Sequence, residues 1–226
     1  MRKLILKMHV SIDGFVAGPN GEADWIFKSQ DEGVTAWLLD TLQQAGVHIM
    51  GSRTFHDMAA YWPSSPGPLA APMNEIPKVV FSRKGIIEPV SPAVTTRSLR
   101  DATDAMAANG LKPLPALSPS ATTWDEASIA GGDLSVEIAR LKHQPGKEIL
   151  AHGGGRFAQS LAKLGLIDEY RLLVHPVALG GGLPLFSALQ KPIDFKLISS
   201  TAFGAGAIAN VYRPVYVDFR VELSQM

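Results

Sequence analysis

The stretch with the richest chemistry runs from Lys147 to Phe157 and reads K-E-I-L-A-H-G-G-G-R-F. Residues 149–151 form a short apolar run that is typical of a buried strand, and three glycines follow at once. Apolar side chains then recur at helical spacing, at Phe157, Leu161 and Leu164. The stretch is therefore predicted to be a strand, a glycine turn and the start of a helix.

Such a turn can bind phosphate. The N-terminus of a helix offers unpaired N–H groups and a partial positive charge, and glycines let an anion approach the backbone closely. The alternative is a tight turn at which two elements pack against each other. Because the glycines do not follow the spacing G-x-G-x-x-G, the stretch does not indicate a Rossmann domain.

Two further strand ends carry an arginine. Residues 47–50 read as a strand that runs into Gly51-Ser52-Arg53-Thr54, and residues 78–81 read as a strand that runs into Ser82-Arg83. The planar guanidinium group suits phosphate because it donates two parallel hydrogen bonds. The alternatives to phosphate binding are that the arginines are ordinary solvated surface residues and that Ser52 or Thr54 only caps a helix.

The first strand, over residues 4–10, leads into a loop from Ser11 to Trp25. Asp13 is a candidate for contact with a ligand, but because glycine follows it, the alternative is that it only forms an ordinary Asp-Gly turn. Loops that follow a strand and carry aromatic side chains often form one wall of a ligand site. The loop is therefore a candidate substrate wall.

Composition limits the classes of function. The chain has 226 residues, 21 basic and 21 acidic side chains and no cysteine, which argues against nucleic-acid or anionic-membrane partners and excludes thiolate catalysis. The six histidines show no H-E-x-x-H pair, so no metal site is predicted, and no G-x-S-x-G or P-loop motif occurs. The N-terminal residues are too polar for a signal peptide and no apolar run could span a membrane, which predicts a cytoplasmic protein.

Strands and helices alternate first, and strands then follow one another. A helical stripe from Val34 to Ala45 ends at Gly46, residues 62–77 are expected to be an irregular surface connection, and a surface insertion is expected at about residues 87–122. Asp133 is a predicted N-cap for a helix through residues 134–141, and residues 195–203 and 208–217 are predicted to form a terminal hairpin. The pattern favours an α/β fold with a mixed sheet, helices on both faces and an antiparallel end.

The order of five motifs resembles the dihydrofolate reductase superfamily. They read S-I-D-G-F-V-A-G, M-G-S-R-T-F, V-V-F-S-R, H-G-G-G-R-F and L-I-D-E-Y followed by P-V-A-L-G-G-G-L-P-L-F. Within the superfamily, the chain is similar to the reductase domain of the bacterial bifunctional riboflavin deaminase–reductase. The resemblance covers nearly the whole chain except the 87–122 insertion, and it implies one dihydrofolate reductase-like domain over residues 1–226 with a mostly parallel sheet.

The resemblance also implies an NADPH site at the strand ends. Ser82 and Arg83 would contact the 2′-phosphate, and Gly153 and Gly154 would lie under the pyrophosphate and nicotinamide half, often joined by a cis peptide bond. The full set of cofactor-binding residues would be Gly51, Ser52, Arg53, Thr54, Ser82, Arg83, His152, Gly153, Gly154, Gly155, Arg156 and Phe157.

The implied chemistry is hydride transfer to a small heterocyclic or carbonyl/imine substrate. Where dihydrofolate reductases have a carboxylate on the first helix, this chain has Thr35, so Asp13 and Asp31 are the candidate catalytic residues and true folate reduction is disfavoured. Ser11, Trp25 and Phe27 are the candidate substrate contacts. Lys7 and His9 would line the strand beside them.

Two alternatives stay open. The first is reduction of the ribosylamino-pyrimidine intermediate of riboflavin synthesis, although the loop from Gly14 to Asp24 offers no basic group for a ribose phosphate. The second is a catalytically silent NADPH-binding or scaffold protein. By family likeness, the chain is expected to form a homodimer through the exposed edge of its terminal hairpin.

Overall fold

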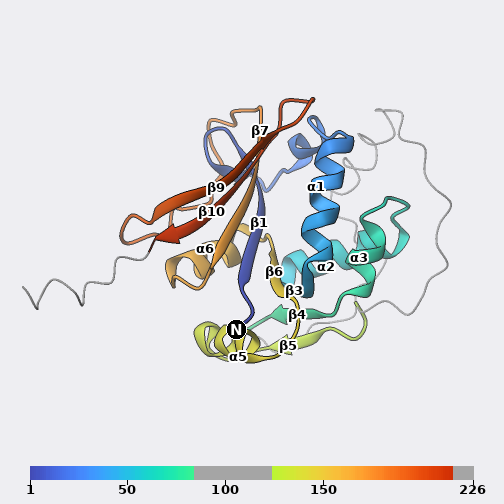
Figure 1. Cartoon of the computed structure of the whole chain (residues 1–226), viewed down its shortest axis with the longest axis vertical. Helices are drawn as coiled ribbons and strands as arrows, with labels where there is room; N and C mark the ends of the chain where they lie inside the picture. The colour runs from blue at the N-terminus through green and yellow to red at the C-terminus, as the bar shows by residue number, and fades with distance from the viewer. Residues whose placement is uncertain (84–123, 216–226) are drawn as a thin grey trace, which may run out of the picture.

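The computed structural model describes residues 1–83 and 124–215. Its main sheet has eight strands in the order β5-β4-β3-β6-β1-β7-β10-β9, and β2 and β8 form a separate small sheet. The six strands from β5 to β7 pair in parallel, and β10 and β9 add an antiparallel end (Figure 1). The strands are β1 (Leu4–Ser11), β2 (Phe15–Ala17), β3 (Ala45–Gly51), β4 (Lys78–Phe81), β5 (Ser128–Ala130), β6 (Glu148–His152), β7 (Glu169–His175), β8 (Leu183–Pro184), β9 (Asp194–Ala202) and β10 (Ile208–Val215).

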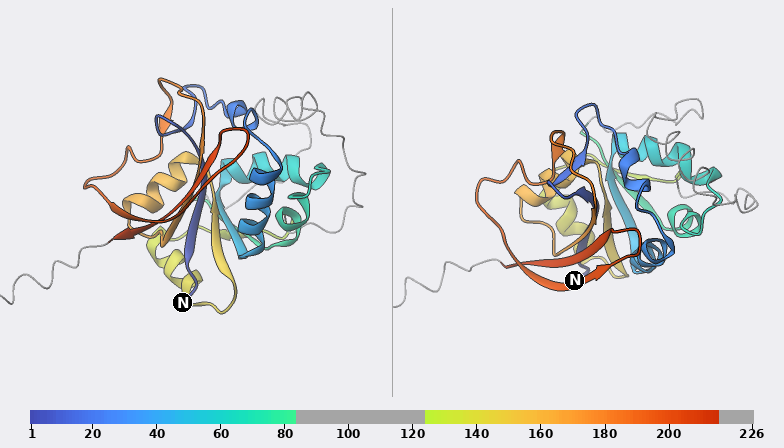
Figure 2. Two further views of the ribbon diagram at one scale, coloured as in Figure 1. Left: turned by 45° about the horizontal axis from the view of Figure 1, so that its top comes forward. Right: turned by 90° about the horizontal axis from the view of Figure 1, so that it is seen from above.

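Helices cover both faces of the sheet, as the turned view in Figure 2 shows. Apolar contacts place α1, α2 and α3 on one face, and α5 and α6 on the other. The α-helices are α1 (Glu32–Gln43), α2 (Ser52–Tyr61), α3 (Ala70–Glu75), α5 (Leu134–His143) and α6 (Gly155–Lys163), and the 3-10 helices are η1 (Asp24–Phe27) and η2 (Trp62–Ser64). This is the predicted three-layer α/β fold.

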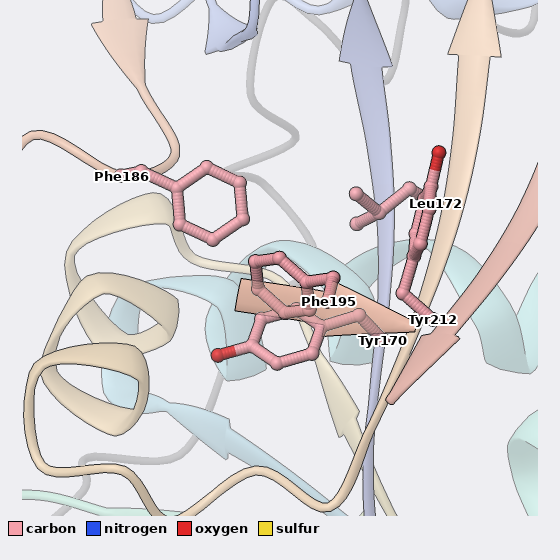
Figure 3. A pocket seen from close by; sticks show the side chains of 5 residues that line it. All are labelled: Tyr170, Leu172, Phe186, Phe195 and Tyr212. Atoms are coloured by element: carbon pink, nitrogen blue, oxygen red, sulfur yellow. The ribbon is translucent and has the colours of Figure 1, made fainter. Parts of the chain in front are cut away.

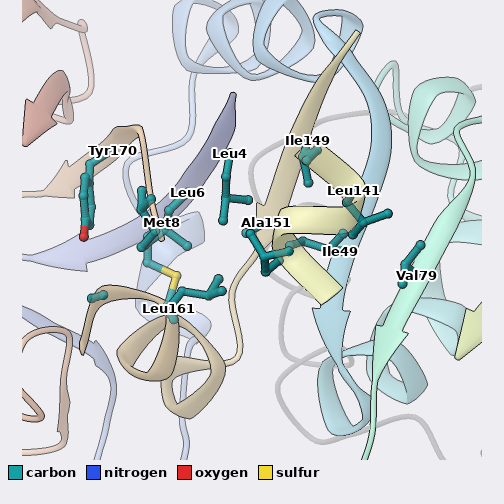
Figure 4. Packing of buried hydrophobic residues seen from close by; sticks show 14 of the residues in the cluster. Leu4, Leu6, Met8, Ile49, Val79, Leu141, Ile149, Ala151, Leu161 and Tyr170 are labelled. Carbon is teal, nitrogen blue, oxygen red and sulfur yellow. The ribbon is translucent and has the colours of Figure 1, made fainter. Parts of the chain in front are cut away.

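The central strand β1 divides its side chains between the two layers. Leu4, Leu6 and Met8 are buried in the cluster that contains α5 and α6 (Figure 4), because alternate residues of a strand point to the same face. The residues between them point to the α1 side, where Ile5 packs with Leu42 of α1. On this second face the strand continues with polar residues, which become important for the site.

Several sequence expectations are confirmed. Strand β4 has the predicted bounds, and the terminal hairpin is present as β9 and β10 up to Val215. Asp133 caps α5, since its carboxylate accepts hydrogen bonds from Ser135 N and Val136 N at 2.9 and 3.1 Å. The predicted insertion at 87–122 lies outside the described residues.

Two local expectations are wrong. Gly46 does not end the first helix, because α1 stops at Gln43 and Gly46 is already inside β3, next to Lys147. Residues 62–77 are not irregular throughout, because they contain η2 and α3. The helix α3 forms despite the surrounding prolines because it buries Ala70 and Met73 against the α1 layer.

Candidate cofactor and substrate site

Two strand-to-helix turns meet at the carboxyl ends of β3 and β6. The strands pair in parallel with Ile49 beside Ala151, so the helices that follow them begin side by side. A Cβ atom built on Gly154 would lie 2.6 Å from Thr54 Oγ1, which is closer than real Cβ contacts allow. The two turns for which the sequence predicts anion binding are therefore adjacent, and a glycine is required where they touch.

The helix ends at this site have no side-chain cap. Gly51 and Gly154 are the N-cap residues of α2 and α6, and neither helix has an acidic residue in its first turn. By contrast, Asp31 and Asp133 cap α1 and α5 with their carboxylates. Because uncapped N–H groups and helix dipoles attract anions, the α2 and α6 ends are suited to phosphate groups. The alternative that Ser52 or Thr54 caps α2 is wrong.

The glycine turn itself is made by backbone angles that favour glycine. The φ angle is 25° at Gly153 and 76° at Gly154. The expected cis peptide bond between them is wrong, because the bond is trans and positive φ angles bend the chain instead. The carbonyl of Gly154 accepts hydrogen bonds from Phe157 N at 2.8 Å and Ala158 N at 3.0 Å, which starts α6.

The predicted arginines lie around this turn on the surface. Arg53, Arg83 and Arg156 are all exposed, and none forms an ion pair with a described residue. Ser82 donates its backbone N–H to Ala130 at 3.1 Å, which fixes the end of β4 beside β5. Phe157 packs against Phe81 with ring centroids 5.1 Å apart, so β4 and α6 are in contact. Arg83 and Arg156 are therefore available to an anionic ligand, whereas Arg53 also interacts electrostatically with Asp57 of α2.

Asp13 links the first loop to the second glycine loop. Its carboxylate accepts hydrogen bonds from Ser11 Oγ at 2.6 Å, from Gly180 N at 2.7 Å and from Leu179 N at 3.0 Å. These bonds, with that from Ser11 contributing most, lower the pKa of the Asp13 carboxyl to about 2. Asp13 is therefore ionised near neutral pH, and its geometry fits a positioning role better than proton donation.

Replacing Asp13 with asparagine is expected to change the acid stability of the protein. Because the folded pKa of about 2 lies below the unfolded value of 3.8, the charged carboxylate stabilises the fold above about pH 4 and loses this effect as the pH falls toward 2. Melting temperatures of the wild type and Asp13→Asn should differ above pH 5 and converge between pH 4 and 2. A difference that does not change with pH would contradict this account of Asp13. Ser11→Ala should move the convergence to higher pH.

The carboxylate of Asp31 connects two elements of the fold through hydrogen bonds to backbone N–H groups. Its carboxylate accepts a hydrogen bond from Val34 N at 2.7 Å, which caps α1. It accepts another from Ala205 N at 2.9 Å, in the turn between β9 and β10. The hydrogen bond from Val34 N contributes most to a lowered pKa of the Asp31 carboxyl. These contacts join α1 to the hairpin, and a catalytic role for Asp31 stays a prediction.

A hydrogen-bonded row of basic side chains lies on the α1 face of β1 and β7. Lys7 Nζ lies 3.3 Å from His9 Nε2, His9 Nδ1 lies 2.8 Å from His175 Nε2, and His175 Nδ1 lies 2.7 Å from Ser29 Oγ. Trp25 meets the His175 ring edge-on at 5.4 Å. Trp25 is thus buried beside this row, and Phe27 lies partly buried at the end of the same 3-10 helix.

The row continues toward the glycine turn. The pairing of β1 with β6 puts Lys7 beside His152, the residue before Gly153. His152 in turn contacts His48 of β3, with ring centroids 4.4 Å apart. Sequence reasoning found Lys7, His9 and His152 separately but missed His175, Ser29 and His48. The alternation of Lys7, His9 and Ser11 could have shown that these three share one face of β1, but it gives no indication of His175, Ser29 or His48.

The opposite face carries a separate cavity of about 310 Å³. It is lined by aromatic and aliphatic side chains, shown in Figure 3: Tyr170, Leu172, Phe186, Phe195 and Tyr212. Since Tyr170 belongs to the α5/α6 cluster, this cavity is on the far side of the sheet from Lys7. It has no charged lining residue and is not part of the candidate site.

Other kinds of site are not supported by the described part of the chain. Within residues 1–83 and 124–215, no three potential metal-ligating side chains gather into a group. In the same ranges, no helix has the length and apolar character required to cross a membrane. The turns at Gly51 and Gly154 and the row at Lys7 thus remain the principal chemical features.

Comparison with known proteins identifies the family of this chain. The family model described as RibD C-terminal domain matches residues 2–209. The uncharacterized protein YyaP of Bacillus subtilis (strain 168) is 30% identical over 211 residues, which cover 93% of this chain and 94% of YyaP.

Solved structures share the fold. A putative riboflavin biosynthesis protein from Shewanella sp. PV-4 superposes with a TM-score of 0.66 at 22% identity, over 96% of this chain and 100% of that one. The diaminohydroxyphosphoribosylaminopyrimidine deaminase/5-amino-6-(5-phosphoribosylamino)uracil reductase from Thermotoga maritima has a TM-score of 0.62 at 18% identity, over 95% of this chain and 57% of that protein.

Proposed function

This chain belongs to the RibD C-terminal domain family, and on that premise we propose that it is an NADPH-dependent reductase of a small heterocyclic or carbonyl/imine substrate. The observation that carries the proposal is the contact between two uncapped helix N-termini at Gly154 and Thr54. Two adjacent helix ends favour a ligand with two linked phosphates, which is the centre of a dinucleotide.

The residues present fit such a cofactor. Residues 51–54 and 153–157 would hold the phosphates through backbone N–H groups, and His152 would border the nicotinamide. Ser82 and Arg83, at the end of the next strand, would bind the 2′-phosphate that distinguishes NADPH from NADH. When bound, the nicotinamide would supply the hydride, while this chain's residues hold the substrate and exclude water.

The substrate side of the site would be formed from the α1 face of β1. Trp25 and Phe27 would form an aromatic wall, and Ser11 is held by its bonds to Asp13 and Phe15 N at 2.6 and 2.9 Å. Asp13 would fix the two loops around the substrate rather than donate a proton. In this proposal, Asp13 acts on the substrate through the loops that it joins.

Arg83→Ala is expected to weaken NADPH binding by about 10- to 150-fold and NADH binding by less than about threefold. A charge-assisted hydrogen bond to the 2′-phosphate is worth roughly 1.5–3 kcal/mol, and NADH lacks that phosphate. The measurement is a fluorescence titration with each cofactor. Arg140→Ala, which changes an exposed arginine on α5, is the control. Equal losses for NADPH and NADH would rule out this assignment of Arg83.

One specific alternative is reduction of a ribosylamino-pyrimidine, which is supported by the fold shared with the Thermotoga maritima deaminase/reductase. Turnover with that substrate would establish it. A catalytically silent cofactor-binding protein is the other alternative, and any substrate-dependent oxidation of NADPH would exclude it.

We also infer a homodimer. Eight of the nine residues of the edge strand β9 are exposed, and Leu197 and Ile198 are 52% and 41% exposed on opposite faces. Light scattering at micromolar concentration tests this, and a monomer mass would contradict it.

A further inference from the structure

We propose that Lys7 binds a single negative charge on the substrate, such as a carboxylate, and that His9 and His175 position its ammonium group. The site would lie on the α1 face of the sheet, one strand away from the Gly153–Gly154 turn. Identifying the anion as the substrate rests on the proposed reductase function. The anion site itself follows from the arrangement of the basic side chains.

The three side chains are held in fixed positions by one another. Because Lys7 Nζ can only donate to His9 Nε2, His9 carries its hydrogen on Nδ1 and donates a hydrogen bond to His175 Nε2, 2.8 Å away. Ser29 Oγ, 2.7 Å from His175 Nδ1, fixes the far end, and Lys7 Nζ, 3.3 Å from His9 Nε2, is the near end. Lys7 and His9 are partly exposed, whereas Ser29 and His175 are buried, so a ligand would reach the row at Lys7 and His9.

No carboxylate balances this row among the described residues. The positive charge of Lys7 lowers the pKa of both His9 and His175, and His175 also lowers the pKa of His9, whereas no carboxylate in the described ranges raises either pKa. From β6 and β3 the neighbouring titratable groups are His152 and His48, and from β4 it is Lys78.

The remaining charged groups nearby already have partners. On β7, Arg171 donates to Glu169, Thr41 and Gln44, and Glu169 also pairs with Arg213. Asp13 is bound by Ser11 and backbone amides. From α1, the residues that pack on Leu173 beside the row are the apolar Val34 and Leu38. No carboxylate in the described part of the protein therefore neutralises the positive charge of this row, and an anionic ligand could do so.

Two buried histidines beside the row have nitrogen atoms without a hydrogen-bond partner in the described residues. These atoms are His152 Nε2 and both ring nitrogens of His48, and the two residues are 1% and 0% exposed. Buried polar atoms are normally satisfied by protein, water or ligand. Because His152 lies beside Lys7, its unpartnered nitrogen offers a further hydrogen-bonding atom between the row and the glycine turn.

The charge of the site favours a monoanion over a phosphate dianion. Burial lowers the pKa of Lys7 to about 8, so its ammonium group still carries a charge at pH 7. Burial and the nearby Lys7 lower the pKa of His175 to about 4, and burial lowers that of His9 well below its usual value, so both imidazoles are neutral. The single N–H of each neutral imidazole is already used, that of His9 toward His175 and that of His175 toward Ser29. Lys7 therefore supplies the one positive charge that matches one negative charge, and Trp25 adds an aromatic wall for a planar ligand.

The test uses benzoate as the probe and its neutral isostere benzamide as the control ligand. Nitrogen-15 NMR of the full chain at pH 7 follows the imidazole nitrogens of all six histidines. Benzoate is expected to shift the signals of His9 and His175 saturably and to bind at least tenfold more tightly than benzamide. Equal binding of the two compounds, or shifts that never saturate, would overturn the proposal.

Variants test the role of Lys7 directly. Lys7→Met is expected to weaken benzoate binding at least tenfold without changing benzamide binding, and Lys7→Arg should restore most of the loss. Lys3→Met, which removes an exposed lysine directly before β1, is the matched control and should have no effect. If Lys7→Met does not fold, Lys7→Gln replaces it. Unchanged benzoate affinity in the folded Lys7 variant would overturn the proposal.

A titration with NADPH on the same samples separates this proposal from the reductase function. NADPH binding without benzoate binding would retain the cofactor site and reject the anion site. Benzoate binding without NADPH binding would retain the anion site and reject the proposed reductase.

Discussion

Replacing Gly154 with alanine is expected to weaken NADPH binding at least about a hundredfold, which corresponds to about 2.7 kcal/mol. The φ angle of Gly154 is 76°, a conformation that costs an alanine roughly 1–2 kcal/mol. In addition, the new methyl group would lie 2.6 Å from Thr54 Oγ1. The turn would have to move away from α2, and the two helix N-termini would no longer point at the same phosphates.

Gly21→Ala is the matched control for this experiment. Gly21 has a φ angle of 89°, but a Cβ atom there would have no neighbour within 4 Å. It therefore imposes the same kind of backbone strain without the clash between the helix ends. Binding is measured by fluorescence, and circular dichroism verifies the fold. If Gly154→Ala binds NADPH as tightly as Gly21→Ala does, the cofactor is not held at this turn.

Replacing Gly182 with alanine is expected to reduce the free energy of unfolding by about 3–5 kcal/mol. A Cβ atom at this position would lie 3.1 Å from the carbonyl carbon of Ala17 and would overlap its oxygen. Those atoms are backbone, so no side chain can move aside, and overpacking of this kind costs roughly 1–3 kcal/mol. The φ angle of 139° adds strain of a similar size.

Gly181→Ala is the control, because it changes the neighbouring residue but brings no atom within 4 Å of the added methyl group. Urea unfolding gives the free energy of each variant. The effect of Gly182→Ala should also reach the substrate side, since β2 pairs with β8 directly after Gly182 and Asp13 binds the same loop. Equal stability of the two variants would mean that the β2–β8 contact is not as close as described.

Local patterns in the sequence were sufficient to predict much of the fold. The apolar run before Gly153 and the helical spacing after it identified the β6–α6 unit, because both periods are short and visible in the chain. The predicted N-cap Asp133 and the bounds of β4 were correct for the same reason. By contrast, α3 was missed, because its helix depends on burying Met73 in tertiary contacts rather than on a local pattern.

The candidate site depends on pairings between distant parts of the chain. His9 and His175 are 166 residues apart, and they meet because β1 and β7 pair with one particular register. The bond from Gly180 N to Asp13 spans 167 residues in the same way. The register cannot be read from spacings in the sequence, so Asp13 and the adjacent Ser11 could be singled out, but the distant partners Leu179 and Gly180 could not. His175 therefore had no visible connection to the substrate loop.

The most direct test of the account is a titration of the purified protein with NADPH and with NADH, followed by the fluorescence of its four tryptophans. The account predicts saturable NADPH binding in the micromolar range and at least tenfold weaker binding of NADH, because Arg83 and Ser82 would contact the 2′-phosphate. No binding of either cofactor, or equal binding of both, would contradict it.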